Sequence, residues 1–170
     1  IKEAYSGSAY TSARLLSKDK FSFKYGKIEV RAKLPAGGGT WPAIWMLGNN
    51  ISTTPWPACG EIDIMELRGQ EPSVINGTLH GPGYSGGASI TKAYALTDGR
   101  FDTDYYVYAV EWGEDYIDFF VNDYLYQRLT PENVTGDWVY NEPFYPTGNI
   151  ETDIAYLEHY FIGVTGKNPE

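Results

Sequence analysis

Short runs in which apolar and polar residues alternate cover most of the chain, and turn residues separate them. In one run the charged side chains Lys27, Glu29, Arg31 and Lys33 alternate with apolar ones. A period of two is that of a β-strand with one buried face. By the same pattern, strands are predicted over residues 10–17, 21–34, 41–48, 60–66, 74–80, 105–112, 116–123 and 124–129.

None of these runs has the 3.6-residue period of a helix, and tight turns such as Gly113-Glu114-Asp115 join neighbouring runs. The pattern therefore predicts an antiparallel, all-β sandwich. Three stretches fit it less well. Residues 91–101 read as a polar connection, residues 144–149 as a strand that breaks early, and residues 150–160 are ambiguous and even helical.

Three carboxylates fall within the segment GEIDIME, which otherwise reads as a buried strand. Strand alternation puts Glu61 and Asp63 on one face and the isoleucines on the other. Continued strictly, it would place Glu66 among apolar side chains, at a cost of several kcal/mol. We therefore predict a β-bulge near Ile64 and Met65 that returns Glu66 to the acidic face.

With the bulge, Glu61 and Glu66 are effectively four positions apart, about 13 Å between Cα atoms. Side chains that lean inward can bring the two carboxyl groups to either side of one sugar ring. Glycoside hydrolysis needs such a pair, about 5–5.5 Å apart for retention and about 6.5–9.5 Å for inversion, and spacing alone does not choose between them. Crowding by Asp63 should raise at least one pKa, so that one carboxyl holds a proton near neutral pH. The same pattern also fits a solvent-exposed acidic edge strand or a cation-binding site.

Composition narrows the choice of ligand. Aromatic residues make up 16% of the chain, with 15 Tyr and 5 Trp, which suits stacking on sugar rings as well as ordinary cross-strand pairs. The formal net charge of −9 argues against nucleic acid or an anionic membrane as partner. No apolar run reaches the roughly 18 residues of a membrane-spanning helix. The lone Cys59 can form no internal disulfide and reads as a small packed residue.

Several motifs together resemble glycoside hydrolase family 16. GEIDIME is similar to its active-site signature E-I-D-I-M-E, whose Met is typical of the laminarinase-like, endo-1,3-β-glucanase branch. The segments YGKIEVRAKLP, GTWPAIWMLG and GTLHGPGYSG resemble further family segments, and the similarity covers residues 10–143. It implies a jelly-roll, concanavalin-like sandwich with a concave substrate cleft. By this resemblance Glu61 is the nucleophile, Glu66 the general acid/base and Asp63 the assisting carboxylate between them.

The same resemblance implies a set of substrate-binding residues around the acids. The family's matching Arg faces the cleft, its tryptophans line it, and its His lies beside the acid/base glutamate. The residues at these and neighbouring positions are Arg31, Trp41, Trp45, Asn49, His80, Tyr84 and Trp112. Read from the residues alone, a cross-strand ion pair for Arg31, two core indoles for Trp41 and Trp45, a turn role for Asn49 and a structural His80 remain open.

A complete family domain has strands before Ile1 and after Glu170. Residues 1–170 are therefore expected to form a single domain that lacks N- and C-terminal strands, which a missing segment or a second chain would complete. The chemistry needs no cofactor or metal. Many relatives bind a structural calcium ion, partly through terminal segments, and its ligands cannot be placed here.

The resemblance implies retaining endo-hydrolysis of a laminarin-type β-1,3-glucan. The alternatives are a non-catalytic β-glucan-binding protein, and a transglycosylase or hydrolase of a related β-glucan or galactan. Polymer hydrolases act outside the cell, so secretion is expected from the suspected polysaccharide substrate.

Overall fold

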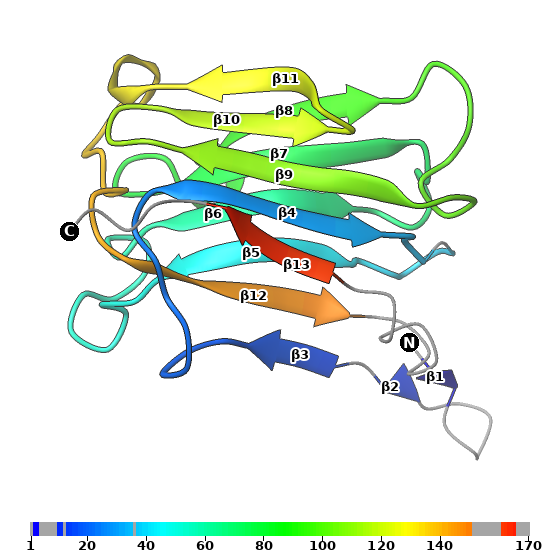
Figure 1. Cartoon of the computed structure of the whole chain (residues 1–170), viewed down its shortest axis with the longest axis horizontal. Helices are drawn as coiled ribbons and strands as arrows, with labels where there is room; N and C mark the ends of the chain where they lie inside the picture. Colours follow the sequence, from blue (N-terminus) through cyan, green and yellow to red (C-terminus); the bar gives the residue numbers. More distant parts are fainter. Residues whose placement is uncertain (1, 4–9, 12, 36, 151–160, 166–170) are drawn as a thin grey trace.

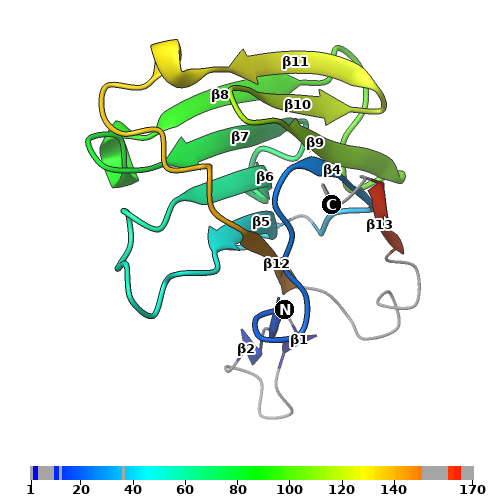
Figure 2. The same ribbon diagram turned by 60° about the vertical axis from the view of Figure 1, so that its left-hand side comes forward.

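Two antiparallel sheets lie one on the other in the computed structural model, which describes residues 2–3, 10–11, 13–35, 37–150 and 161–165 (Figure 1, Figure 2). The six-stranded sheet has the order β3-β12-β5-β6-β7-β8 and the five-stranded sheet the order β11-β10-β9-β4-β13. The predicted antiparallel β-sandwich is confirmed. No helix of the described part is long and apolar enough to cross a membrane.

The six-stranded sheet consists of β3 (Ala13–Leu16), β12 (Phe144–Ile150), β5 (Ala43–Gly48), β6 (Glu61–Leu67), β7 (Val74–His80) and β8 (Ile90–Ala95). The five-stranded sheet consists of β11 (Tyr124–Leu129), β10 (Ile117–Val121), β9 (Tyr106–Trp112), β4 (Gly26–Ala32) and β13 (Phe161–Thr165). A short pair, β1 (Lys2–Glu3) and β2 (Tyr10–Thr11), and two 3-10 turns, η1 (Gly86–Ala88) and η2 (Pro131–Asn133), complete the described elements.

The main core lies between the two sheets, and β6 supplies four of its members. Ile62, Ile64, Met65 and Leu67 are each at most 1% exposed and pack with side chains of the facing sheet such as Phe119. Burying an aliphatic side chain of this size contributes roughly 1.5–3 kcal/mol to folding. The apolar face of β6 is therefore fixed against the five-stranded sheet, which turns its acidic face the other way.

The pairing of β6 contains the predicted bulge. On β7, Asp63 lies opposite Thr78 and Glu66 opposite Asn76, so two residues of β6 face one residue of β7 between them. The pairing with β5 shifts at the same place. From Glu61 to Glu66 the strand advances by only four residues of β7, about 13 Å. The bulge puts both glutamates on the same face, as predicted.

Gly77 is the residue of β7 that faces the bulge. A Cβ added there would collide with the hydroxyl of Tyr126 and come within 2.7 Å of a ring carbon of Phe119. Both aromatic rings belong to the facing sheet. The glycine thus lets the five-stranded sheet pack closely behind the bulge.

Two strands differ from the sequence-based expectation. β12 continues through Pro146, which lies one residue before the pairing with β3 begins at Thr147, so that pairing loses no hydrogen bond. β8 forms where a polar connection was expected. Most side chains of this edge strand are exposed, so its sequence lacks the alternation of apolar and polar residues by which a strand is predicted. Residues 151–160, which were ambiguous in sequence, lie outside the described residues.

Deleting Met65 tests the bulge. With one residue fewer, strict alternation would still place all three carboxylates on one face, so the variant should fold. We expect it to lose about 2–5 kcal/mol of unfolding free energy, as for removal of one buried Met side chain. Denaturant unfolding measures this loss.

The matched control is deletion of Ile75 in β7, a strand that has no extra residue in this pairing. That deletion moves the following side chains to the opposite face and should prevent cooperative folding. Equal tolerance of the two deletions would contradict the assignment of the bulge.

Candidate active site

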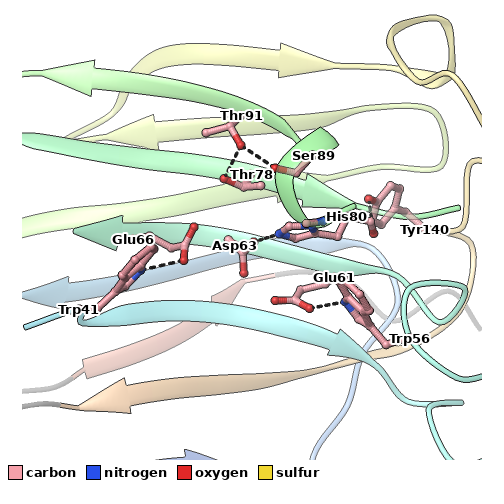
Figure 3. Close-up of polar contacts among 11 residues, drawn as sticks. Trp41, Trp56, Glu61, Asp63, Glu66, Thr78, His80, Ser89, Thr91 and Tyr140 are labelled. Carbon is pink, nitrogen blue, oxygen red and sulfur yellow. Dashed lines mark hydrogen bonds and ion pairs between the residues drawn. The ribbon is translucent and has the colours of Figure 1, made fainter. Parts of the chain in front are cut away.

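Glu61, Asp63 and Glu66 project from the face of β6 that is turned away from the main core (Figure 3). We call the side of the six-stranded sheet that carries these three residues the acid face. Asp63 is 3% exposed, whereas the two glutamates are half-buried. The central carboxyl is thus covered, and the outer two remain accessible to a ligand.

Each outer glutamate accepts a hydrogen bond from an indole. Trp56 Nε1 donates to Glu61 Oε2 at 2.6 Å, and Trp41 Nε1 donates to Glu66 Oε1 at 2.9 Å. Both tryptophans are about half exposed, 44% for Trp56 and 50% for Trp41. Two exposed indoles therefore orient the carboxylates at either end of the acidic row (Figure 3).

His80 contacts the middle carboxyl. Its Nε2 lies 3.1 Å from Asp63 Oδ2, and its Nδ1 accepts a hydrogen bond from the backbone N–H of Gly86 at 3.1 Å. Because Nδ1 is an acceptor, the imidazole proton lies on Nε2 and faces Asp63. The His80 ring also contacts the Trp56 ring, with centroids 5.8 Å apart.

Crowding and burial change the protonation of the acids. Burial, and then the charge of Glu66, raise the pKa of Asp63 to about 8. Burial, and then the charge of Asp63, raise the pKa of Glu61 to about 7. Both carboxyls therefore keep a proton to a higher pH than a free carboxylic acid, as the crowding of the three acids predicted.

Only some of the other predicted site residues lie near the acids. Trp41 lies on the acid face, and His80 lies beside Asp63 rather than beside Glu66. Trp45 is paired with Asp63 in the sheet but is only 8% exposed, and the Arg14 guanidinium lies 4.4 Å from its ring centroid. Trp45 therefore fits both interpretations left open by the sequence, that of a residue lining the cleft and that of a packed indole.

Asn49 follows β5 and is exposed. Its backbone N–H donates to Pro143 O at 2.7 Å, and its side chain lines a cavity near the β3–β4 turn. This position allows contact with a ligand, although at some distance from the acids.

The predicted cleft position is wrong for three residues. Arg31 lies on β4 in the opposite sheet, where its guanidinium lies 4.2 Å from the Tyr105 ring centroid, so it cannot orient a carboxylate of β6. Trp112 is 1% exposed in the core, and its Nε1 donates to Tyr140 O. Tyr84 is also 1% exposed, and its hydroxyl donates to the Asp137 carbonyl.

The predicted site residues do not include Trp56, which donates the shorter of the two indole hydrogen bonds. Sequence reasoning also missed a row of hydroxyls, in which Thr91 Oγ1 lies 3.1 Å from both Thr78 Oγ1 and Ser89 Oγ. Counting back by twos from His80 along β7 would have placed Thr78 on the acid face. Trp56 lies in an irregular loop, and no periodicity predicts where its side chain points.

One group among the described residues could hold a metal ion. Possible ligand atoms of Glu61, Asp63 and His80 all lie within 4.8 Å of one another. These are two of the three acids of β6 and the imidazole that contacts Asp63. The described part of the chain therefore places no metal centre apart from the candidate active site.

Comparisons with known proteins agree with this geometry. The family model described as glycosyl hydrolases family 16 matches residues 3–155. The chain is 42% identical to a beta-glucanase of Rhodothermus marinus, over 99% of this chain and 60% of that protein. It is 40% identical to a beta-1,3-glucan-binding protein of Penaeus monodon, over 79% of this chain and 39% of that protein.

Among solved structures, the catalytic domain of an endo-1,3-beta-glucanase (laminarinase) from Thermotoga petrophila superposes with a TM-score of 0.81 at 47% identity. That match covers 88% of this chain and 61% of the other. The chain thus spans about 60% of the length of the Rhodothermus marinus and Thermotoga petrophila proteins and 39% of that of the Penaeus monodon protein.

The raised carboxyl pKa values predict how stability depends on pH. The folded state keeps protons that the unfolded chain releases near pH 4, so unfolding free energy falls as the pH rises from about 4 to 8. Asp63→Asn removes one such carboxyl and relieves the other. We expect the variant to lose less unfolding free energy than the wild type between about pH 5 and pH 8, as measured by denaturant unfolding.

Asp115→Asn, at an exposed position, is the control and should follow the wild-type profile. If Asp63→Asn also followed the wild-type profile, the raised pKa values of these buried carboxyls would be refuted.

Proposed function

Because the chain belongs to glycosyl hydrolase family 16, we propose that it hydrolyses β-1,3-linked glucan within the polymer, with retention of configuration. The observation that carries the proposal is the bulged strand β6, which places three carboxylates in one row and leaves each outer glutamate oriented by an indole N–H. The relatives named beta-glucanase and laminarinase support β-1,3-glucan as the substrate.

In the proposed first step, the Glu61 carboxylate attacks the anomeric carbon and the bond to the glycosidic oxygen breaks. Glu66, in its protonated form, gives its proton to that oxygen, which leaves as the hydroxyl of the departing sugar. In the second step, Glu66 takes a proton from water, and the water oxygen displaces Glu61 from the anomeric carbon. Two inversions at this carbon give net retention.

Asp63 acts on Glu61 through the proton that it holds. A protonated Asp63 can donate a hydrogen bond to Glu61 while Glu61 carries charge, which stabilises the carboxylate before attack and after its release as leaving group. The burial that raises the pKa of Asp63 supports this role. Trp56 and His80 hold the pair in place from the two sides.

The surroundings of the acids support a neutral polysaccharide. Trp41 and Trp56 offer exposed indole rings on which sugar C–H faces can stack. The net charge of −9 disfavours a polyanion such as nucleic acid. A polymer of this kind is met outside the cell, so we also infer secretion. Calcium bound away from the acids would be structural, because the carboxylate chemistry needs no metal.

Replacing Glu61 tests the catalytic assignment. Glu61→Gln keeps the shape of the side chain but cannot form the covalent intermediate, so laminarin cleavage should fall at least about a thousandfold. Azide should rescue Glu61→Ala and give an α-configured glycosyl azide. Reducing-end assays and product analysis by NMR measure both results, and Glu132→Gln, at an exposed position in η2, is the control.

Undiminished cleavage by Glu61→Gln would refute this role. A wild-type protein that binds laminarin without cleaving it would instead favour the class of the Penaeus monodon relative, which is named as a binding protein. Parallel assays on lichenan and agarose separate a β-1,3-glucanase from hydrolases of related glucans and galactans.

Two substitutions at His80 test its polar contact with Asp63. His80→Phe keeps an aromatic ring against Trp56 but removes the N–H, whereas the amide N–H of His80→Gln can still reach Asp63. A hydrogen bond between uncharged groups contributes about 0.5–1.5 kcal/mol, so removing the imidazole N–H in His80→Phe should lower kcat roughly 2- to 13-fold with little change in KM. His80→Gln should recover most of kcat, and equal loss in both variants would show that the ring alone matters.

A further inference from the structure

The last residue of β7 is anchored by a buried tyrosine. The hydroxyl of Tyr140 donates to the carbonyl oxygen of His80 at 3.0 Å (Figure 3). Tyr140 is itself held in place, because its side chain is fully buried and its carbonyl oxygen accepts the indole N–H of Trp112 at 3.0 Å. Its ring also meets the Trp138 ring edge to face, with centroids 4.8 Å apart. The backbone of His80 thus has a rigid anchor in addition to its strand pairing.

The turn that follows His80 is anchored to the same segment, residues 135–140, which we call the strap. Gly81 and Tyr84 close this turn by exchanging two backbone hydrogen bonds of 3.0 Å. The Tyr84 side chain folds back over the turn, since a Cβ added to Gly81 would lie 2.3 Å from its hydroxyl oxygen. That hydroxyl donates to the carbonyl oxygen of Asp137 at 2.8 Å. Tyr84 therefore ties the turn to the strap.

The strap and the turn also meet backbone to backbone. A Cβ added to Gly136 would lie 1.8 Å from the carbonyl oxygen of Pro82, so only glycine permits this approach. Beside it, Thr135 Oγ1 donates to the carbonyl oxygen of Gly83 at 3.3 Å. Because no flexible side chain separates the two segments at Gly136, the position of the strap determines that of the turn.

The same loop supplies the group that decides which nitrogen of His80 carries the proton. Gly86 lies two residues beyond Tyr84, and its backbone N–H donates to His80 Nδ1 at 3.1 Å. Gly86 has a φ of +55°, in the left-handed region that favours glycine. An acceptor at Nδ1 places the imidazole proton on Nε2, the nitrogen that lies 3.1 Å from Asp63 Oδ2. The strap therefore holds both parts of this arrangement, the His80 backbone and the turn that leads to Gly86.

We propose that Tyr140 and Tyr84 are positioning residues that keep the proton of His80 on its Nε2 nitrogen. Tyr140 holds the backbone of His80, and Tyr84 holds the turn that brings the Gly86 N–H to Nδ1. Loss of either anchor lets the loop relax, so that Gly86 no longer occupies Nδ1 and the imidazole proton divides between the two nitrogens. The inference rests on the proposed function and deepens it, because His80 contacts the assisting carboxyl of Asp63.

The first test measures the tautomer. Tyr140→Phe and Tyr84→Phe each remove one anchoring hydroxyl and keep the ring. Long-range ¹H–¹⁵N NMR at mildly alkaline pH, where histidine rings are neutral, distinguishes the protonated ring nitrogen from the unprotonated one, and the His80→Gln spectrum assigns the signals of the two histidines. The wild type should show an unprotonated Nδ1, whereas both tyrosine variants should show a mixture of tautomers. Tyr116→Phe, the control, removes a hydroxyl that donates to Glu111 on the other sheet and should keep the wild-type signal.

The second test asks whether Tyr140 acts through His80. Each tyrosine variant should lower kcat roughly 2- to 13-fold, the range expected for loss of one hydrogen bond between uncharged groups, with little change in KM. The double variant His80→Phe/Tyr140→Phe should have the kcat of His80→Phe alone, because the ring that Tyr140 positions is gone. Multiplied losses in the double variant would show that Tyr140 acts on the fold instead, and would overturn the proposal.

Thermal unfolding identifies the variants that are folded at the assay temperature. If Tyr140→Phe is not among them, Tyr84→Phe and its double variant with His80→Phe carry both tests.

The tautomer measurement also separates this inference from the proposed function. Mixed tautomers in the folded tyrosine variants, but not in the control, support the positioning role even if the wild type cleaves no glucan. An unchanged tautomer in these variants overturns it even if cleavage is efficient. A wild type whose His80 Nδ1 is protonated overturns it without any variant.

Discussion

The extra residue absorbed in β6 is the constraint on which the site depends. A regular strand would carry Glu61 and Glu66 on opposite faces, and Glu66 would lie unpaired among Ile62, Ile64 and the facing aromatic rings, at a cost of several kcal/mol. The bulge lets the apolar side chains on either side of it keep their places in the core while both glutamates face outward. Core packing and the acid row are therefore satisfied by the same local irregularity.

The acid row also divides its face of the sheet into two chemically different halves. Toward β7 and β8 lie His80 and the linked hydroxyls of Thr78, Thr91 and Ser89. Toward β5 and β12 lies a small apolar cluster formed by Ala43, Trp45, Leu47, Cys59 and Tyr145. Asp63 lies between the two halves, and its low exposure follows from having a packed indole on one side and an imidazole on the other.

The sequence allowed prediction of those features that depend on local periodicity. Alternation identified which residues of β4 and β6 face the core, and a misplaced charge identified the bulge. The family resemblance implies a cleft position for Arg31, and alternation, which cannot say which sheet a strand joins, does not reveal that β4 lies in the other sheet. The same limit explains Trp112. The position of Trp56 is set by an irregular loop, and the place of Pro146 within β12 depends on where the pairing with β3 begins. Neither can be predicted from a local sequence pattern.

Burial of Asp63 opposes folding and favours the proposed catalysis for the same physical reason. A covered carboxyl loses hydration, which penalises its charged form and raises its pKa to about 8. Burial and the charge of Asp63 likewise raise the pKa of Glu61, to about 7, so both carboxyls keep protons above their usual range. Exposing Asp63 would stabilise the fold at alkaline pH, but an ionised Asp63 could not donate the proposed hydrogen bond to Glu61. The low exposure of a polar residue at the centre of this sheet thus serves the proposed chemistry rather than packing.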